Sequence, residues 1–144
     1  MLDAIVEDMT LFLRKHKREL TKAKVLVIGF AFKGRPTTSD IRGSVTYALV
    51  RRLQKKKIST IHGFDPFVHP DHIKKADVTV VTDLKKGISG ADIVVVMNNN
   101  LEFENIDMRK LLAPHDRSLL LLDTWSLYSK EELSKLDHVV HKTL

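Results

Sequence analysis

Residues 25–34 read VLVIGFAFKG, and residues 40–44 read DIRGS. The aliphatic run that stops at Gly29 predicts a buried strand, and the loop that follows carries two cations, Lys33 and Arg42. A strand, a basic loop and the start of a helix, in this order, are typical of a phosphate-binding turn. The stretch therefore predicts an α/β fold with an anion site beyond the end of its first strand.

The common dinucleotide fingerprint is absent from this turn. Ala31 stands two residues after Gly29, where the fingerprint has its second glycine, and no third glycine follows at the expected spacing. The loop therefore requires a more specific interpretation than a generic NAD-binding motif.

The rest of the chain alternates apolar runs with helical patterns, which favours parallel βαβ units. We predict an α/β fold with a doubly wound, Rossmann-like and mostly parallel sheet, preceded by an amphipathic helix over residues 2 to about 18. The predicted strands cover residues 24–28, 59–63, 78–81, 93–97, 119–123 and 138–140. The predicted helices cover residues 44–56, 84–89, 107–112 and 130–135, with Ser44, Asp83, Asp107 and Ser129 as N-caps.

Composition limits the functions that the chain can have. Its 144 residues suffice for one core, and the absence of cysteine excludes disulfides, thiolate metal sites and cysteine nucleophiles. No apolar run approaches the ~18 residues of a membrane span, and acidic residues near the N-terminus do not fit a signal peptide. We expect a soluble, cytoplasmic protein that does not bind a membrane.

The formal charge of +6 raises the question of nucleic acid. Two clusters supply much of it, at residues 14–18 and 55–57, and both fall at predicted helix C-termini, where the helix dipole favours cations. Aromatic residues do not interleave with them, so we expect no nucleic-acid partner. The histidines lack metal-ligand spacing, with His69 and His72 the nearest approach to it, and we expect no metal site.

The loop after the first predicted strand holds the best candidates for ligand binding. Ligands of open parallel sheets bind beyond the carboxyl ends of the strands, where Lys33 can meet a phosphate and Arg42 can form a bidentate contact. Gly34 and Gly43 allow close backbone approach or a positive φ beside them. On the alternative interpretation both cations are exposed loop residues, and Asp40 caps the helix or pairs with Arg42.

The order of several short motifs resembles the C-terminal domain of the UDP-glucose/GDP-mannose dehydrogenase family. That family has G-x-A-F-K, a variable loop and D-x-R-x-S, followed by a strand ending in D-P, a G-A-D strand with an E-F pair, and a last strand ending in Asp. The matching residues here are Gly29 to Lys33, Asp40 to Ser44, Phe64 to Pro66, Gly90 to Val96 with Asn98, Glu102 and Phe103, and Leu122-Asp123.

The resemblance implies roles for three residues. Phe32 and Lys33 would bind the UDP-sugar, and Arg42 would approach NAD, which the family binds mainly through an N-terminal domain that we do not find in this chain. The chemistry agrees, because a lysine can neutralise a diphosphate and an aromatic ring can pack on a sugar or base. The alternative for Phe32 is a core aromatic beneath the loop.

The resemblance also implies how the chain is organised. Residues 1–22 would be the end of the family's central helix and residues 23–144 the UDP-sugar-binding domain, with the NAD-binding and central domains as partners in a homo-oligomer. Because the family's catalytic cysteine is missing, we expect no catalytic residue here and no activity from the chain alone. The first helix would be an exposed appendage unless it folds back or pairs with a second copy.

The last motif departs from the UDP-glucose branch. Asp123-Thr124-Trp125 stands where that branch has D-G-R, and the loop between Lys33 and Asp40 is longer. Both departures are similar to the branch that acts on UDP-N-acetylmannosamine. The alternative to a dehydrogenase domain is a stand-alone nucleotide-sugar-binding or assembly module without catalysis.

Overall fold

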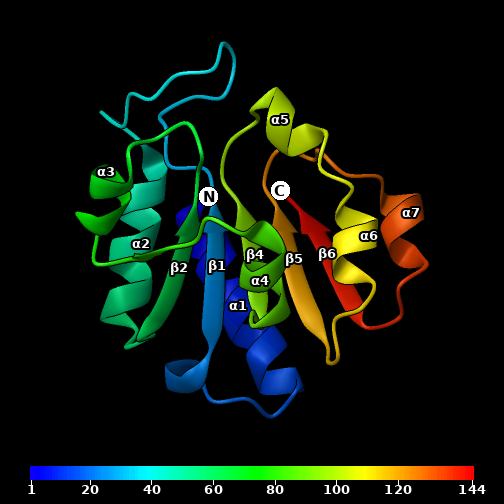
Figure 1. Ribbon diagram of the computed structural model, residues 1–144. Helices are drawn as coiled ribbons and strands as arrows, with labels where there is room; N and C mark the ends of the chain where they lie inside the picture. Colours follow the sequence, from blue (N-terminus) through cyan, green and yellow to red (C-terminus); the bar gives the residue numbers. More distant parts are fainter.

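The computed structural model describes residues 1–144 and contains one six-stranded sheet in the order β3-β2-β1-β4-β5-β6 (Figure 1). Every neighbouring pair of strands is parallel. The strands are β1 (Lys24–Ile28), β2 (Thr60–Phe64), β3 (Thr79–Val80), β4 (Ile93–Val96), β5 (Leu119–Asp123) and β6 (Val139–Thr143). This confirms the predicted doubly wound, Rossmann-like fold, and the sheet is wholly parallel.

Helices connect the strands. They are α1 (Leu2–Lys15), α2 (Val45–Lys55), α3 (Pro70–Lys74), α4 (Leu84–Ser89), α5 (Leu101–Glu104), α6 (Met108–Leu112) and α7 (Lys130–Ser134), with a 3₁₀ turn over Leu20–Lys22. The sequence did not predict α3, α5 or the 3₁₀ turn, because segments of five residues or fewer carry little more than one turn of helical periodicity. The equally short α6 and α7 were predicted through their N-caps, Asp107 and Ser129. No helix combines the length and the apolar character needed to cross a bilayer.

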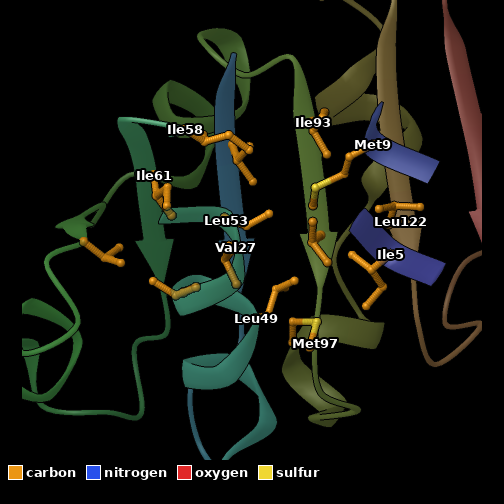
Figure 2. Close-up of a cluster of buried hydrophobic side chains, with 14 of the residues drawn as sticks. Ile5, Met9, Val27, Leu49, Leu53, Ile58, Ile61, Ile93, Met97 and Leu122 are labelled. Carbon is orange, nitrogen blue, oxygen red and sulfur yellow. The ribbon is translucent and has the colours of Figure 1, made fainter. Parts of the chain in front are cut away.

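The sheet separates two hydrophobic layers, and alternate residues of β1 serve each of them. Val25 and Val27 join the layer covered by α1, α2 and α3, whereas Leu26 and Ile28 join the layer beneath α4, α5, α6 and α7. Strands buried on both faces must be apolar throughout, which explains the unbroken run VLVI. Figure 2 shows the first layer, where side chains of α1 and α2 meet those of the strands.

Helix α1 folds back onto the sheet and is part of the core. Ile5 and Met9 are 0% exposed, and they lie near Ile93 and Leu122 in Figure 2. The apolar stripe is therefore covered, and the interpretation as an exposed appendage is wrong. The helix ends at Lys15, short of the predicted residue 18, and Lys17 adopts a positive φ of 56°. The division of the chain at residue 22 stays a prediction.

A buried carboxylate fixes the return from α1 to β1. Asp92 accepts a hydrogen bond from the backbone N–H of Lys24 at 2.8 Å and contacts the guanidinium groups of Arg18 and Arg117 at 3.4 and 3.1 Å. Arg18 also donates to the carbonyl of Ser118 at 2.6 Å. Part of the first basic cluster thus holds α1 against the amino-terminal edge of the sheet.

Candidate functional site

The loops after β1 and β4 leave the same edge of the sheet and rise side by side at the top of Figure 1. Chain connections run to opposite sides from these two neighbouring strands, which is the topological switch point where ligands of such sheets bind. Residues 29–44 form the first loop and residues 97–100 the second.

A carboxylate at the end of β2 holds the first turn of the β1 loop. Asp65 is 5% exposed, and it accepts hydrogen bonds from the backbone N–H groups of Phe30 at 2.8 Å, Ala31 at 3.3 Å and Phe67 at 3.0 Å. Gly29 turns the chain with φ +99°, which a side chain would strain. The chain therefore leaves β1 in one fixed direction.

The β1 and β4 loops touch at Gly34. A Cβ on Gly34 would lie 2.2 Å from the backbone nitrogen of Asn100, so only glycine lets the two backbones approach. Arg35 reinforces the contact, because it donates to the carbonyl of Asn99 at 2.7 Å and pairs with Glu104 at 2.7 Å. The close backbone approach predicted for the loop glycines is confirmed at Gly34. The predicted positive φ is confirmed at Gly43, which has φ +75°.

A cavity of about 430 Å³ opens between these loops and the turn after β5. None of its lining residues is acidic, whereas Lys33 and Arg35 are cationic, so the cavity suits an anion. Its lining residues are Met1, Ala31, Phe32, Lys33, Arg35, Ser44, Val45, Thr46, Met97, Asn98, Asn99, Thr124 and Trp125.

Two aromatic rings stand at this cavity with their faces partly open. Phe32 is 44% exposed and Trp125 is 53% exposed, and Lys33 Nζ lies 5.2 Å from the centroid of the Phe32 ring. The aromatic buried beneath the loop is Phe30, at 0% exposure, so the core interpretation of Phe32 is wrong. The cavity thus offers a cation beside aromatic surface, which suits a phosphate joined to a ring.

A buried carboxylate at the end of β5 positions the Trp125 turn. Asp123 is 0% exposed, and it accepts hydrogen bonds from the N–H groups of Leu127 at 2.8 Å and Tyr128 at 3.0 Å. His141 Nε2 lies 3.1 Å from the same carboxylate. The indole N–H of Trp125 in turn donates to the carbonyl of Met97 at 3.2 Å, so the ring is held toward the β4 loop.

These contacts make the stability of the protein depend on the ionisation of Asp123. Burial raises the pKa of Asp123, but the His141 bond and the two N–H groups more than offset it, so the pKa lies below its usual value. A carboxylate with a depressed pKa in the folded state stabilises the protein above its unfolded pKa of about 3.9. That contribution is lost as the pH falls through the folded pKa.

Asp123→Asn should therefore lower the free energy of unfolding near neutral pH by about 2 kcal/mol, because an amide offers one acceptor where two N–H groups require one each. The deficit should shrink below about pH 4, where the carboxylate of the unfolded wild-type chain begins to take up a proton. Urea unfolding of both proteins from about pH 7 to about pH 3 measures it. A deficit that is the same at every pH would contradict this account.

Arg42 lies outside the cavity. Its side chain is 89% exposed and holds Asp40 in a bidentate pair, with nitrogen-to-oxygen distances of 2.7 and 3.0 Å. The hydrogen bond from Arg42 lowers the pKa of Asp40 to about 2. The structure thus brings Phe32 and Lys33 together in the cavity and leaves Arg42 outside it. The pair of Arg42 with Asp40 is one of the two alternatives predicted for Asp40. The role of Arg42 toward NAD stays a prediction.

The predicted N-cap of α2 is confirmed in its position but not in its hydrogen bond. Ser44 stands at the N-cap position, but its side chain makes no capping hydrogen bond, and its buried oxygen has no partner. The other predicted caps are confirmed, because Asp83, Asp107 and Ser129 each accept a hydrogen bond from the first turn of their helices.

The β1 turn does not fit a complete NAD site. A dinucleotide turn uses glycines so that a pyrophosphate can approach the backbone. Here the space next to Gly34 is filled by the backbone of Asn99 and Asn100, so this glycine packs two loops together and leaves no room for a pyrophosphate against it. Nor does any group of three or more metal-ligating side chains stand together.

Asn98 and Trp125 were not predicted as site residues. A usable signal exists, since each follows the carboxyl end of a strand, and ligands of such sheets bind at that edge. Only the order of the strands reveals that β4 lies directly beside β1 and β5 beside β4.

Comparison with known proteins gives a family match. Residues 26–130 match the model of the UDP-glucose/GDP-mannose dehydrogenase family, UDP binding domain. No curated protein matches the chain in sequence.

Solved structures share the fold. A UDP-D-ManNAc dehydrogenase from Pyrococcus horikoshii aligns over 94% of this chain and 28% of its own, with a TM-score of 0.73 and 18% identity. An NDP-N-acetyl-D-galactosaminuronic acid dehydrogenase from Methanosarcina mazei Go1 aligns over 99% and 28%, with a TM-score of 0.79 and 17% identity. A UDP-N-acetyl-mannosamine dehydrogenase from Staphylococcus aureus aligns over 99% and 30%, with a TM-score of 0.71 and 19% identity. The chain therefore spans less than a third of each of these proteins.

Proposed function

The chain belongs to the UDP-glucose/GDP-mannose dehydrogenase family, and from that membership we propose that it is the C-terminal nucleotide-sugar-binding domain of an NAD-dependent UDP-sugar 6-dehydrogenase. Such an enzyme oxidises the sugar of a UDP-sugar to a UDP-uronate. The observation that carries the proposal is the cavity at the switch point, where Lys33 stands beside the open ring of Phe32, Trp125 lines the same cavity, and no lining residue is acidic.

Each of these residues has a task that its chemistry suits. The Lys33 ammonium neutralises the diphosphate as a mobile point charge. Phe32 and Trp125 offer flat apolar surface to the rings on either side of the diphosphate, and stacked rings exclude water from it. The domain thus binds and orients the substrate, while oxidation takes place on residues of the other domains.

In the proposed enzyme this chain contributes only one contact to the bound NAD. NAD supplies the oxidising power in the proposed enzyme, and the N-terminal domain holds it. Arg42, exposed at the surface and paired only with Asp40, approaches it from this side. The chain has no cysteine on which a thioester could form, so the domain alone should not oxidise a UDP-sugar.

We propose a UDP-N-acetylhexosamine such as UDP-N-acetylmannosamine as the substrate. Asp123-Thr124-Trp125 replaces the D-G-R of the UDP-glucose branch, so an aromatic face lines the cavity where that branch presents a guanidinium. An indole face favours an apolar substituent, such as the methyl of an N-acetyl group, over a charged one. The proposed setting is a cytoplasmic homo-oligomer that makes precursors for polysaccharides.

Titration of the chain with UDP, UDP-N-acetylmannosamine and UDP-glucose, followed by NMR, tests the proposal. We expect weak, saturable binding, with shifts concentrated at Phe32, Lys33 and Trp125, and tighter binding of the N-acetylated sugar than of UDP-glucose. NAD⁺ added to the complex should not be reduced. The absence of any shift at millimolar UDP would overturn the proposed function.

A further inference from the structure

Two polar side chains of the cavity have hydrogen-bonding groups that the chain itself does not use. Asn98 is 4% exposed and lines the cavity, yet its amide nitrogen has no partner within the chain. The Ser44 hydroxyl is also unpartnered, but its oxygen is enclosed and does not open into the cavity. Buried polar groups normally find partners, because leaving one unpaired is costly, so an unpaired donor that opens into a cavity indicates where a ligand binds.

We propose that Asn98 is a ligand-binding residue whose amide N–H groups donate to the diphosphate of a nucleotide sugar, next to the N-terminus of α2. This inference rests on the proposed function and adds to it a second diphosphate contact, on the β4 loop opposite Lys33.

The orientation of the Asn98 amide is set by its neighbours. Its oxygen Oδ1 accepts a hydrogen bond from the backbone N–H of Asn100 at 3.1 Å, which fixes Nδ2 as the free end. Gly29 lies against the amide, since a Cβ there would stand 3.1 Å from Asn98 Cγ. Nδ2 has no partner in the chain and is not enclosed, so it opens into the cavity as a pure donor.

Helix α2 adds donors of the same kind. It is 11 residues long, no side chain caps its first turn, and Ser44, Val45 and Thr46 all line the cavity. Its free N–H groups and the positive end of its dipole favour an anion. A diphosphate between the Lys33 ammonium, the Asn98 amide and this helix start would meet donors on every side and no carboxylate.

Asn98→Asp tests the role of the amide with little change in shape. The aspartate keeps an oxygen for the N–H of Asn100 and replaces only the donor that faces the cavity. We expect it to weaken the binding of both UDP and inorganic pyrophosphate by about tenfold or more, because a charged hydrogen bond is lost and a like charge is added. Calorimetry or NMR titration measures the change.

Asn105→Asp is the matched control. Asn105 is exposed after α5 and lies outside the cavity, so this variant has the same charge change and should bind both probes as the wild type does. In the wild-type protein, the Asn98 side-chain NH₂ resonances should shift when UDP is added and those of Asn105 should not. This measurement needs no variant, so it serves even if Asn98→Asp does not fold.

The outcomes separate the inference from the proposed function. Unchanged affinity of Asn98→Asp, or Asn98 resonances that UDP does not move, would overturn the inference alone. Weaker binding of UDP with unchanged binding of pyrophosphate would also overturn it, since the amide would then contact the base or sugar. A wild-type protein that binds neither probe would overturn the proposed function, and the inference with it.

Discussion

Lys33→Ala should weaken the binding of UDP by about 10- to 100-fold. The ammonium stands at the cavity beside the Phe32 ring, and a hydrogen bond to a charged group is worth about 1.5–3 kcal/mol. Little compensation is available from other side chains, because the only other cationic side chain of the lining, Arg35, is already paired with Glu104 and bonded to the carbonyl of Asn99. Calorimetric or NMR titration of both proteins with UDP measures the loss.

Lys55→Ala is the matched control for this experiment. It removes the same charge at the end of α2 opposite the cavity, where the residue is exposed. If attraction between a basic protein and an anion were the whole cause, the two variants would lose affinity equally. Equal losses, or a Lys33→Ala protein that binds UDP within about twofold of wild type, would contradict the assigned role of Lys33.

Gly34→Ala should destabilise the fold by about 1–3 kcal/mol and reduce UDP binding by about tenfold or more, because the two loops that form the cavity must separate. The added Cβ would lie 2.2 Å from the nitrogen of Asn100 and 2.6 Å from the carbonyl carbon of Asn99. Both are backbone atoms, which cannot turn aside as a side chain does. The separation would also break the hydrogen bond from Arg35 to Asn99.

Gly90→Ala provides the comparison for Gly34→Ala. Gly90 has φ −92°, and a Cβ there would meet no atom within 4 Å, so the same methyl group should leave both stability and UDP binding unchanged. Urea unfolding and UDP titration of the two variants measure the difference. Wild-type stability together with wild-type affinity in Gly34→Ala would refute the loop contact as a determinant of the site.

Much of the fold could be predicted because its signals are local. The strands β1 and β5 were predicted to the residue, since unbroken aliphatic runs mark strands buried on both faces. Caps at Asp83, Asp107 and Ser129 were predicted because an N-cap contact spans only about three residues. Ser44 stands at the N-cap position as predicted, but its hydroxyl is buried and makes no capping bond.

The candidate site was predicted only in part. Phe32 and Lys33 share a cavity, as their neighbouring positions after β1 suggested, but Arg42 lies nine residues further along and forms a pair with Asp40 outside it. Asn98 and Trp125 each follow the carboxyl end of a strand, which marks them as candidates, but only the strand order shows that they share a cavity with Lys33.

The sequence by itself determined the parallel α/β architecture, the bounds of β1 and β5 and the basic loop, because hydrophobic periodicity, turn residues and charge are properties of short segments. Only the tertiary structure decided that α1 folds into the core, that Gly34 lies against Asn100, and that Asn98 and Trp125 line one cavity with Lys33. These are contacts between residues far apart in the chain, and they depend on which strands become neighbours and on how two loops pack. No short segment carries that information.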